Sequence, residues 1–541
     1  MALARPPAAY PDTSWWGWGD PAEIPVLSEN MLRLLREGLG VRDAARPRPA
    51  SIGGVSLPAP RLPPDSADVL AAVVGAEHAR ADAEARIRHT RGKSTPDLLR
   101  LRAGDAAGAP DLVLLPASHE EVLELLRICS ERSIAVVPFG GGTSVVGGLE
   151  PEAERFTGVV ALDLRRMNAL VALDEESQIA VLEPGLRGPE AEAMLRERGY
   201  TIGHFPQSYE YATLGGFAAT RSSGQASVGY GRFDDLVVRL RVATPQGTLE
   251  AGRAPKTAAG PDLRQLILGS EGTLGVITAL TVELRPAAQL SVYDGWRFRS
   301  FGEGMRALRG LAQAGPMPTV LRLSDEAETA LALATPKSLG EPPEEDGGCL
   351  AIVGYEGSAE DLSPRVAGVK WALERSGAER DRAAGAAWAE GRYHGPYLRD
   401  ALLDAGALVE TLETVAFWSR LPALYDAVGN AVRDTLTGLG TPPVVLCHVS
   451  HLYRTGASLY FTVACAQAAD PVAQWRAAKQ AAADAILAAD GSITHHHGIG
   501  TDHRPWYDRE VGPLGLSALR AIKAELDPAG IMNPGVLLPV G

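Results

Sequence analysis

The sequence contains very few cysteines, and this shortage bears on where the protein works. Four occur in 541 residues, and no two of them have C-x-x-C spacing. So few cysteines in so long a chain argue against a disulfide framework and are typical of a reducing compartment. We therefore expect a cytoplasmic protein with unpaired cysteines, which are Cys129, Cys349, Cys447 and Cys465.

Positive charge and long apolar runs are also scarce. Acidic residues outnumber Lys and Arg by 66 to 52, and the resulting formal charge of −14 argues against a nucleic-acid partner. No uninterrupted apolar run approaches the roughly 18 residues of a membrane span, although a peripheral membrane contact stays open. The N-terminus lacks a signal-peptide pattern, and the C-terminus is not a peroxisomal signal.

The length and composition indicate a globular protein of two or three domains, with 45% hydrophobic and 22% charged residues. Residues 1 to about 65 are Pro-rich, and their Trp15, Trp16 and Trp18 are expected to pin this segment to a neighbouring surface. The Ala-rich residues 66–88 predict a single helix. From about residue 287, strand-like runs alternate with Ala-rich helices, which indicates a second α+β domain.

The stretch Ile134–Gly148 organises the first half of the chain. A β-branched run ends at Pro138 and leads directly into Gly140, Gly141 and Gly142. Free N–H groups in such a turn form a concave nest for an anion, usually a phosphate. The stretch has neither the Lys of a nucleotide triphosphate loop nor the spacing of a dinucleotide fingerprint. Taken alone, it fits a bound pyrophosphate and a ligand-free turn about equally well.

Strands and helices predicted around this stretch suit a nucleotide-binding α+β domain. Ser118 followed by Glu121 is a capping box, and the apolar residues after it share one helical face. Pro189 is placed to open a second helix. The predicted strands are 111–115, 134–138, 159–164, 169–173, 178–183 and 236–244.

Two further clusters of glycines and hydroxyl residues follow, at 203–224 and 269–278. One glycine turn can arise by chance. Three of them, separated by strands, make a wrapped cofactor the better hypothesis.

The tract His495–His497 allows three interpretations: a metal site, acid/base groups or a solvated tract. In a strand, His495 and His497 would point to one side and His496 to the other, so the three rings would rarely meet one ion. A reference pKa near 6.5 suits histidine for proton transfer at neutral pH.

Taken together, these stretches resemble the vanillyl-alcohol-oxidase class of FAD-binding flavoproteins, which share a PCMH-type FAD-binding domain. Within that class the sequence is most similar to the alkyldihydroxyacetonephosphate synthase family, and the similarity runs from Trp15 to the C-terminus. The pieces that carry it are 138–144, 207–213, 220–223, 270–278, Arg322 in Leu-Arg-Leu-Ser-Asp, Arg399 in Tyr-Leu-Arg-Asp, 456–461 and His495–Gly498.

This resemblance implies a two-domain α+β fold and a redox-neutral transferase. The implied boundaries are an N-terminal segment 1–106, an FAD-binding domain 107–287, a cap or substrate domain 288–500 and a returning segment 501–541. The implied reaction exchanges the acyl chain of acyldihydroxyacetone phosphate for a fatty alcohol in ether-lipid synthesis, through an adduct at the flavin N5. A lipid-like substrate and a homodimer are expected with it.

The resemblance also assigns roles to residues. Tyr460, Arg322 and the histidines His495, His496 and His497 are expected to be catalytic, and Arg399 is expected to bind the substrate anion. No His or Cys lies within 140–148, so the FAD is expected to be non-covalent, and no metal is expected. The expected FAD contacts are Pro138, Phe139, Gly140, Gly141, Gly142, Thr143, Ser144, Gln207, Ser208, Tyr209, Glu210, Tyr211, Ala212, Thr213, Thr220, Arg221, Ser222, Ser223, Glu271, Gly272, Thr273, Leu274, Gly275, Val276 and Ile277.

Two alternatives stay open. FAD-linked dehydrogenases of 2-hydroxy acids, of the D-lactate or glycolate type, resemble the chain too, but they carry a Glu where His496 stands and use it with two strand histidines to hold a divalent metal. His448 and His451 depart from the synthase pattern and leave a metal or another substrate open. A catalytically silent flavin-binding module is the third class, and Tyr460, Arg399 and the histidines weigh against it.

Overall fold

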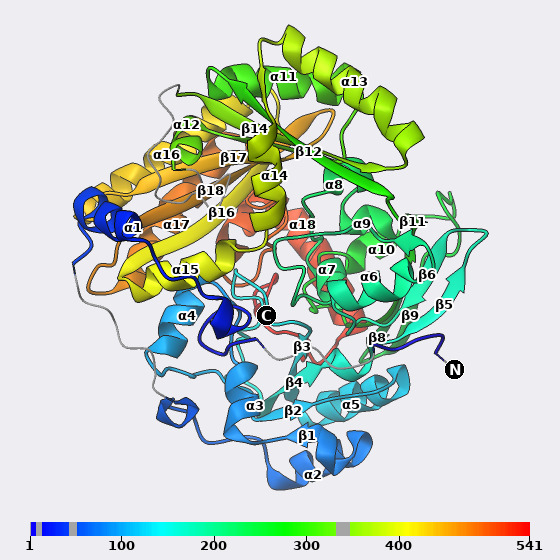
Figure 1. Ribbon diagram of the computed structural model, residues 1–541. Coiled ribbons are helices and arrows are strands. Elements are labelled where there is room, and N and C mark those ends of the chain that lie inside the picture. The colour runs from blue at the N-terminus through cyan, green and yellow to red at the C-terminus, as the bar shows by residue number, and fades with distance from the viewer. Residues whose placement is uncertain (1, 7–12, 43–50, 332–346, 541) are drawn as a thin grey trace.

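The computed structural model describes residues 2–6, 13–42, 51–331 and 347–540. The charged, Pro- and Gly-rich sequence of residues 340–348 predicts a loop, of which residues 340–346 lie outside the described residues. In the described ranges the strands form three main sheets, two from the first half of the chain and one from the second (Figure 1). The α+β class expected from the sequence is confirmed.

The first sheet carries the first glycine cluster at a strand end. Its strands run in the order β1-β2-β4-β3, with β3 and β4 parallel, and helices α2 and α5 pack against it. Ser118 caps α5, but the Glu121 carboxylate accepts from the Ala117 N–H rather than from the cap residue, so the capping box is incomplete. The elements are α2 (Pro64–Val74), β1 (Ala79–Arg80), α3 (Ala83–Arg88), α4 (Thr95–Arg102), β2 (Leu112–Leu114), α5 (His119–Arg132), β3 (Ile134–Phe139) and β4 (Gly158–Asp163).

The single helix predicted over 66–88 is wrong. Helix α2 ends at Val74, because Gly75 adopts φ +89°, outside the helical region. The chain then makes the edge strand β1, which pairs antiparallel with β2, before α3 begins at Ala83. High alanine content predicted helix over both pieces but gave no sign of the turn between them.

The second sheet is antiparallel, in the order β5-β6-β10-β8-β9; the third glycine cluster leads into its central strand β10, and helix α7 of the second cluster packs against that strand. The predicted strands at 169–173, 178–183 and 236–244 correspond to β5, β6 and β8. The elements are β5 (Leu170–Asp174), β6 (Ile179–Leu182), α6 (Gly188–Arg196), β7 (Tyr200–Thr201), α7 (Leu214–Ala219), α8 (Ser227–Tyr230), α9 (Phe233–Leu236), β8 (Val237–Thr244), β9 (Gly247–Ala251), α10 (Arg264–Ile267), β10 (Val276–Glu283) and β11 (Arg285–Pro286).

The third sheet has seven antiparallel strands in the order β15-β12-β14-β13-β17-β18-β16. Helices α11, α13, α16 and α17 cover one face (Figure 1). The elements are β12 (Leu290–Phe298), α11 (Phe301–Ala314), β13 (Val320–Ser324), α12 (Glu326–Ala330), β14 (Cys349–Gly357), α13 (Ala359–Arg375), β15 (Glu379–Asp381), α14 (Arg382–Gly391), α15 (Gly395–Asp404), β16 (Ala407–Phe417), α16 (Leu421–Gly438), β17 (Val444–Leu452), β18 (Gly456–Ala466) and α17 (Pro471–Ala488).

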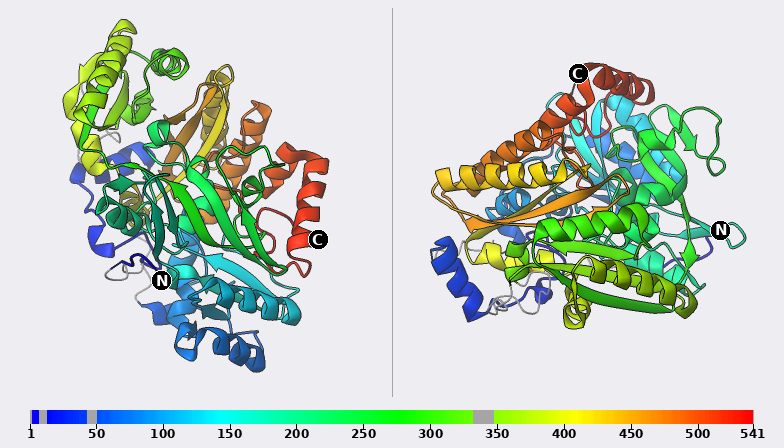
Figure 2. Two further views of the ribbon diagram at one scale, coloured as in Figure 1. Left: turned by 90° about the vertical axis from the view of Figure 1, so that its right-hand side faces the viewer. Right: turned by 90° about the horizontal axis from the view of Figure 1, so that it is seen from above.

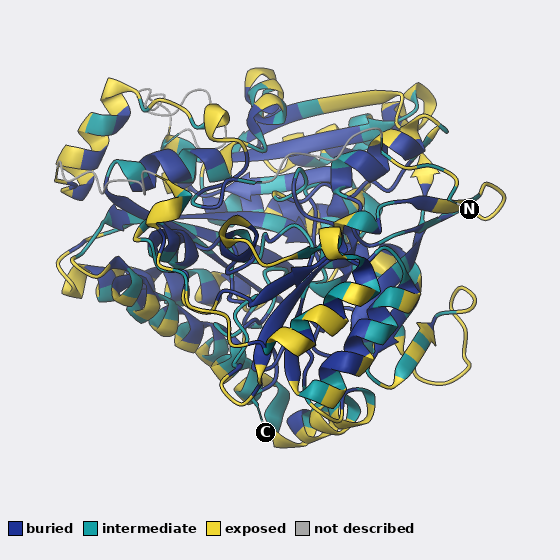
Figure 3. Cartoon of the chain, turned by 90° about the horizontal axis from the view of Figure 1, so that it is seen from below, coloured by how far each residue is buried: buried dark blue, intermediate teal, exposed yellow. Residues whose placement is uncertain are grey.

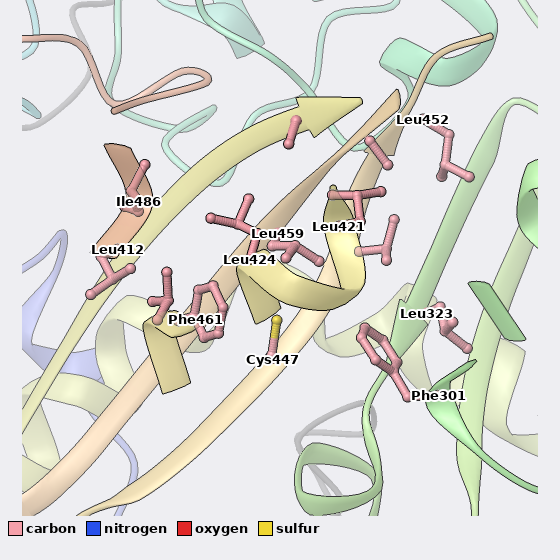
Figure 4. Packing of buried hydrophobic residues seen from close by; sticks show 14 of the residues in the cluster. Phe301, Leu323, Leu412, Leu421, Leu424, Cys447, Leu452, Leu459, Phe461 and Ile486 are labelled. Atoms are coloured by element: carbon pink, nitrogen blue, oxygen red, sulfur yellow. The ribbon is translucent and has the colours of Figure 1, made fainter. Parts of the chain in front are cut away.

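Alternation along β17 and β18 separates a helix-covered core from a polar face. Cys447 and Phe461 point toward Leu421 and Leu424 of α16 (Figure 4). Because successive side chains of a strand alternate between faces, His448 and Tyr460 point the opposite way, toward the first two sheets. All four cysteines are buried and unpaired, as expected.

The last part of the chain returns to the first sheet. After α18 (Arg504–Leu526), residues 531–538 run back beside β3, where the Val136 N–H donates to the Ile531 carbonyl (Figure 2). The Asn533 amide donates to the carbonyls of Gly148 and Glu271, and so joins two of the glycine clusters. The boundaries at 107, 288 and 501 stay a prediction.

The N-terminal tryptophans anchor the start of the chain. Trp15 packs beside Ile87 and Leu101 in a small buried cluster, and Trp18 packs edge-on against Tyr211. Together with α1 (Glu29–Arg33) and the following π-helical turn (Leu34–Gly38), this segment lies along the third sheet. Figure 3 shows how the sheets are buried while the outer faces of the peripheral helices are exposed. Within the described residues, no helix combines the length and the apolar character that crossing a bilayer requires.

Candidate active site

A single cavity of about 560 Å³ collects residues from all three sheets. It contains the first glycine cluster, parts of the other two, and the polar face of β13, β17 and β18. Of the predicted catalytic residues, Tyr460, His496, His497 and Arg322 line it, as does Arg399, whereas His495 lies behind them. The structure therefore brings the predicted cofactor loops and the predicted catalytic residues together.

Most of the expected FAD contacts line this cavity, but six do not. Tyr211 packs on Trp18, the Arg221 guanidinium donates to the Leu268 carbonyl, and Leu274 is buried in the core of the second sheet. Their side chains stabilise the loops that carry the lining residues. The six are Tyr209, Glu210, Tyr211, Arg221, Thr273 and Leu274; the other predicted contacts line the cavity.

The first glycine cluster has the properties of an anion nest. A Cβ on Gly141 would lie 2.0 Å from the Tyr211 carbonyl oxygen, so only glycine permits the approach of these two loops, and Gly142 adopts φ +66°. Within the described residues, the N–H groups of Gly141, Gly142 and Thr143 donate no hydrogen bond. Unused backbone donors at a cavity wall suit a pyrophosphate, so the residues present fit FAD.

A buried carboxylate that the sequence did not reveal shapes the histidine tract. Glu413 of β16 accepts the backbone N–H groups of His495, His496 and His497 at 2.6, 3.0 and 2.9 Å. The segment therefore wraps around one carboxylate as a bend, and the strand geometry assumed for it is wrong. Burial opposes ionisation, yet the facing histidines, His496 first, keep the pKa of Glu413 well below its usual range.

A second carboxylate holds the end of the same segment. Both oxygens of Glu271 accept the Gly500 N–H at 3.0 Å, and one also accepts the Ile499 N–H at 3.0 Å. Burial raises the pKa of Glu271 to about 7. Glu271 belongs to the third glycine cluster and Glu413 to the third sheet, so the histidine segment bridges the two parts of the site.

Because the segment bends, the histidine rings meet. The His495 and His496 Nδ1 atoms are 3.0 Å apart, and His451 stacks on His495 with ring centroids 4.9 Å apart. One ring nitrogen from each of these three residues lies within 4.8 Å of the others, a spacing that a metal ion could bridge. His495 and His496 therefore do not point to opposite sides as expected, although His497 is not part of this three-nitrogen group.

Tyr460 lies at the centre of the polar face. It is the direct cross-strand partner of His448, and the two rings stack with centroids 4.9 Å apart. The rings of His496 and His497 are 6.1 and 5.6 Å away. Burial raises the pKa of Tyr460 to about 12 and lowers that of His497 to about 3, so the phenol is protonated and the imidazole neutral at pH 7.

Arg322, Glu328 and His448 form a buried triad beside Tyr460. Glu328 pairs with the Arg322 guanidinium and with His448 Nδ1, the latter at 2.9 Å. Burial opposes its ionisation, but His448 and Arg322 prevail and lower the pKa of Glu328 to about 2. His448 is thus held by a carboxylate, whereas the cluster with metal-like spacing is built on His451.

Arg399 is positioned through its neighbour in the cavity wall, Lys93. The Arg399 Nη1 donates to the Lys93 carbonyl at 2.6 Å, and its buried Nε has no hydrogen-bond partner within the described residues. Lys93 itself is buried, and burial lowers its pKa to about 7. An unpaired guanidinium donor at the wall suits an anionic group of a ligand. Nothing in the sequence around Lys93 distinguished it from a surface lysine.

One end of the cavity is apolar, and no sequence pattern pointed to it. The residues come from the first helical segment, from α15 and from strands of the third sheet. They include Met31, Leu34, Leu35, Leu39, Leu398, Leu402, Val409 and Leu446. This end of the cavity fits a hydrocarbon chain. Its residues lie far apart in the sequence and far from the catalytic residues, so no local sequence pattern predicts it.

The fold and this site define a flavoprotein of the PCMH type, with an FAD-binding domain and a substrate-binding cap. Residues 110–252 match the family model "FAD binding domain", and residues 288–537 match "FAD linked oxidases, C-terminal domain". FAD is the cofactor.

The comparisons with individual proteins are more specific. The alkyldihydroxyacetonephosphate synthase of Dictyostelium discoideum is 36% identical over 508 residues, which cover 90% of this chain and 83% of that protein. The synthase of Trypanosoma brucei brucei is 32% identical and covers 98% of this chain and 93% of its own length. A solved synthase structure superposes with a TM-score of 0.80 at 31% identity, over 97% of this chain and 98% of that one. The chain belongs to the alkyldihydroxyacetonephosphate synthase family.

Proposed function

We propose that the protein exchanges the acyl chain of acyldihydroxyacetone phosphate for a fatty alcohol and so forms the ether bond of ether lipids. The observation that carries this proposal is the shared cavity. It joins an anion nest, unpaired arginine donors, a Tyr460–histidine acid/base group and an apolar end. A substrate with a phosphate, a reacting carbon and a long chain needs each of these environments.

When bound, FAD would supply the ring nitrogen N5 for the exchange, and the glycine clusters that line the cavity would hold the cofactor. The protein supplies positioning and proton transfer. Arg399 lines the cavity and binds the substrate's anionic group with its guanidinium, and the Met31–Leu39 side of the cavity binds the chain. Neutral His496 and His497 accept a proton beside Tyr460, whose hydroxyl is protonated and therefore donates.

The pyrophosphate of FAD is assigned to the N–H groups of Gly141, Gly142 and Thr143. The loops at 207–213, 220–223 and 271–277 are assigned to the rest of the cofactor. No His or Cys lies in 140–148, so we propose that FAD is held without a covalent bond. The boundaries 1–106, 107–287, 288–500 and 501–541 are our proposed domain division.

We further propose a cytoplasmic homodimer with peripheral membrane contact. The four unpaired, buried cysteines support a reducing compartment. Val26 is 98% exposed, and Leu34 lies partly exposed at the apolar end of the cavity, so this segment is placed to receive a lipid substrate. The homodimer rests on the family resemblance. Light scattering tests the dimer, and vesicle flotation with Val26→Asp and Leu34→Asp tests the membrane contact.

Incubation of the FAD-loaded protein with acyldihydroxyacetone phosphate and a fatty alcohol tests the reaction. We expect alkyldihydroxyacetone phosphate and a fatty acid in equal amounts by mass spectrometry, with no net consumption of oxygen or of a dye acceptor. Dye reduction with D-lactate, and no ether product, would instead establish the 2-hydroxy acid dehydrogenase alternative.

A further inference from the structure

Behind the histidines lies a second cavity, of about 640 Å³, which the proposed reaction does not use. Exposed residues form its rim, among them Phe417, Thr455, Arg509 and Glu510, and Phe417 is 67% exposed. Water therefore reaches this cavity from the surface. Tyr453, the first residue of the turn between β17 and β18, forms part of its wall.

A continuous hydrogen-bonded chain joins this second cavity to the catalytic one. The Tyr453 hydroxyl is 2.6 Å from His495 Nε2, and His495 Nδ1 is 3.0 Å from His496 Nδ1. His496 lines the catalytic cavity, whereas His495 lines neither cavity. His495 thus bridges two residues that face different cavities, which accounts for a third histidine away from the substrate.

The proposed reaction needs such a connection, and the inference rests on that proposal. When an ester is exchanged for an ether, the alcohol O–H bond breaks, and the departing carboxylate keeps the electrons of its bond to the substrate carbon. A carboxylic acid with a pKa near 4 stays ionised at neutral pH, so one proton is released per turnover. The proton is released beside Tyr460 and His496 and must leave the catalytic cavity before the next turnover.

We propose that Tyr453, His495 and His496 form a proton relay that carries this proton from the catalytic cavity to the solvent of the second cavity. His496 receives the proton on the nitrogen that faces the cavity and passes its Nδ1 proton to His495 Nδ1. His495 passes its Nε2 proton to the Tyr453 oxygen, and Tyr453 gives its hydroxyl proton to water. Each residue loses one proton and gains one, so the chain returns to neutrality after each transfer.

Burial, rather than the charges around the relay, keeps a transferred proton from staying on His495 or His496. The Arg232 guanidinium hydrogen-bonds the Tyr453 hydroxyl, and it also disfavours a positive charge on His495 and His496. Burial is the main cause that lowers the pKa of both histidines, and it outweighs the Glu413 carboxylate, which favours a positive charge on both rings. A proton that enters the chain therefore does not stay on an imidazole. Glu413 holds both residues through their backbone N–H groups, and its carboxylate is 3.7 Å from His496 Nδ1, beyond hydrogen-bond distance, so the ring nitrogens stay available to relay the proton.

The test uses the Tyr453→Phe variant. Its formation of ether product is first measured in a buffer whose molecules are too bulky to enter the second cavity. The measurement is then repeated with increasing concentrations of imidazole. Phenylalanine keeps the ring and removes the proton carrier. We expect activity to fall by about 10²-fold, the lower end of the scale for losing a proton-transfer group, and to recover as imidazole rises. The Tyr453→His variant, with a proton-carrying side chain in place, should need no imidazole. Tyr425→Phe is the matched control, because it removes a hydroxyl that donates from helix α16 to Asp325, the N-cap of α12, away from the relay.

Full activity of Tyr453→Phe would overturn the relay, as would a loss that neither imidazole nor the Tyr453→His replacement reverses. If the hydroxyl had a purely structural role, we would expect a loss of activity that neither imidazole nor the Tyr453→His replacement reverses. The wild type is assayed in parallel. If it forms no ether product, the proposed function fails, whereas an active wild type with an imidazole-insensitive variant refutes only the relay.

Discussion

Glu413 and Tyr460 are direct cross-strand partners in β16 and β18, so the carboxylate that holds the histidine segment lies on the same face of the sheet as the phenol. His448 continues the row on β17. The sheet register thus fixes the tyrosine relative to Glu413, and Glu413 fixes the histidines through their backbone. The acid/base group is assembled around this one carboxylate.

Glu413→Gln should therefore disable the site without removing the cofactor. The glutamine amide presents a donor where the histidine N–H groups need an acceptor, so the segment shifts relative to Tyr460. A misplacement on the order of 1 Å costs about a hundredfold in rate, and we expect a fall in kcat of roughly that size. Steady-state kinetics and the FAD absorbance check this result. Glu283→Gln, at a 46% exposed side chain, is the control. Unchanged kcat would show that the histidine segment holds its position without the carboxylate.

The second prediction concerns pH and Glu271. Burial raises its folded-state pKa to about 7, against about 4.3 in an unfolded chain. The stability it contributes is therefore fully present below pH 4.3 and is lost as pH rises through 7. Since glutamine cannot ionise, the stability of Glu271→Gln relative to wild type should rise between pH 5 and 8, by roughly 3 kcal/mol at most. Urea unfolding of the FAD-free proteins measures this difference, with the exposed Glu250→Gln as control. Parallel pH profiles of the two proteins would refute it.

The sequence predicted the local elements better than the long-range contacts. Strands β3 and β4 and the start of α5 follow from residues next to one another, and so does the glycine nest. Glu413 lies more than 80 residues from the histidines that it holds, and nothing near it marks its role. The error at His495–His497 has the same origin, because a strand was assumed for residues that a distant carboxylate bends. The resemblance supplied Tyr460 and Arg399, but not Lys93, Tyr453 or the apolar end of the cavity.

The third prediction is that the flavin is released on denaturation. No His or Cys lies in 140–148, and the first cluster offers backbone N–H groups rather than a nucleophile. After acid precipitation of the FAD-loaded protein, the yellow colour should stay in the supernatant. Colour in the pellet, with a flavin-bearing peptide found by mass spectrometry, would show a covalent tether.

Arg399→Lys should weaken substrate binding more than it slows turnover. Lysine keeps the charge but loses the planar donor set, including the unpaired Nε–H and the bond from Nη1 to the Lys93 carbonyl. A charge-assisted contact contributes roughly 1–3 kcal/mol, which corresponds to about a 5- to 150-fold rise in KM. Arg420→Lys, at a 56% exposed side chain, is the matched control. An unchanged KM would assign Arg399 to the support of the loop at Lys93 alone.

The last prediction separates the synthase reaction from metal-dependent chemistry at Tyr460 and the histidines. Tyr460→Phe removes the hydroxyl and keeps the ring that stacks on His448, so FAD should stay bound. With a pKa near 12 the hydroxyl is protonated at neutral pH, and its loss should lower ether formation by about 10²-fold or more, the scale of a lost acid/base group. Chelator treatment of the wild type should have no effect, because His495 and His496 already hydrogen-bond each other. If dialysis against chelator abolished activity and zinc or manganese restored it, the cluster of His451, His495 and His496 would be a metal site, and the metal-free synthase assignment would be wrong.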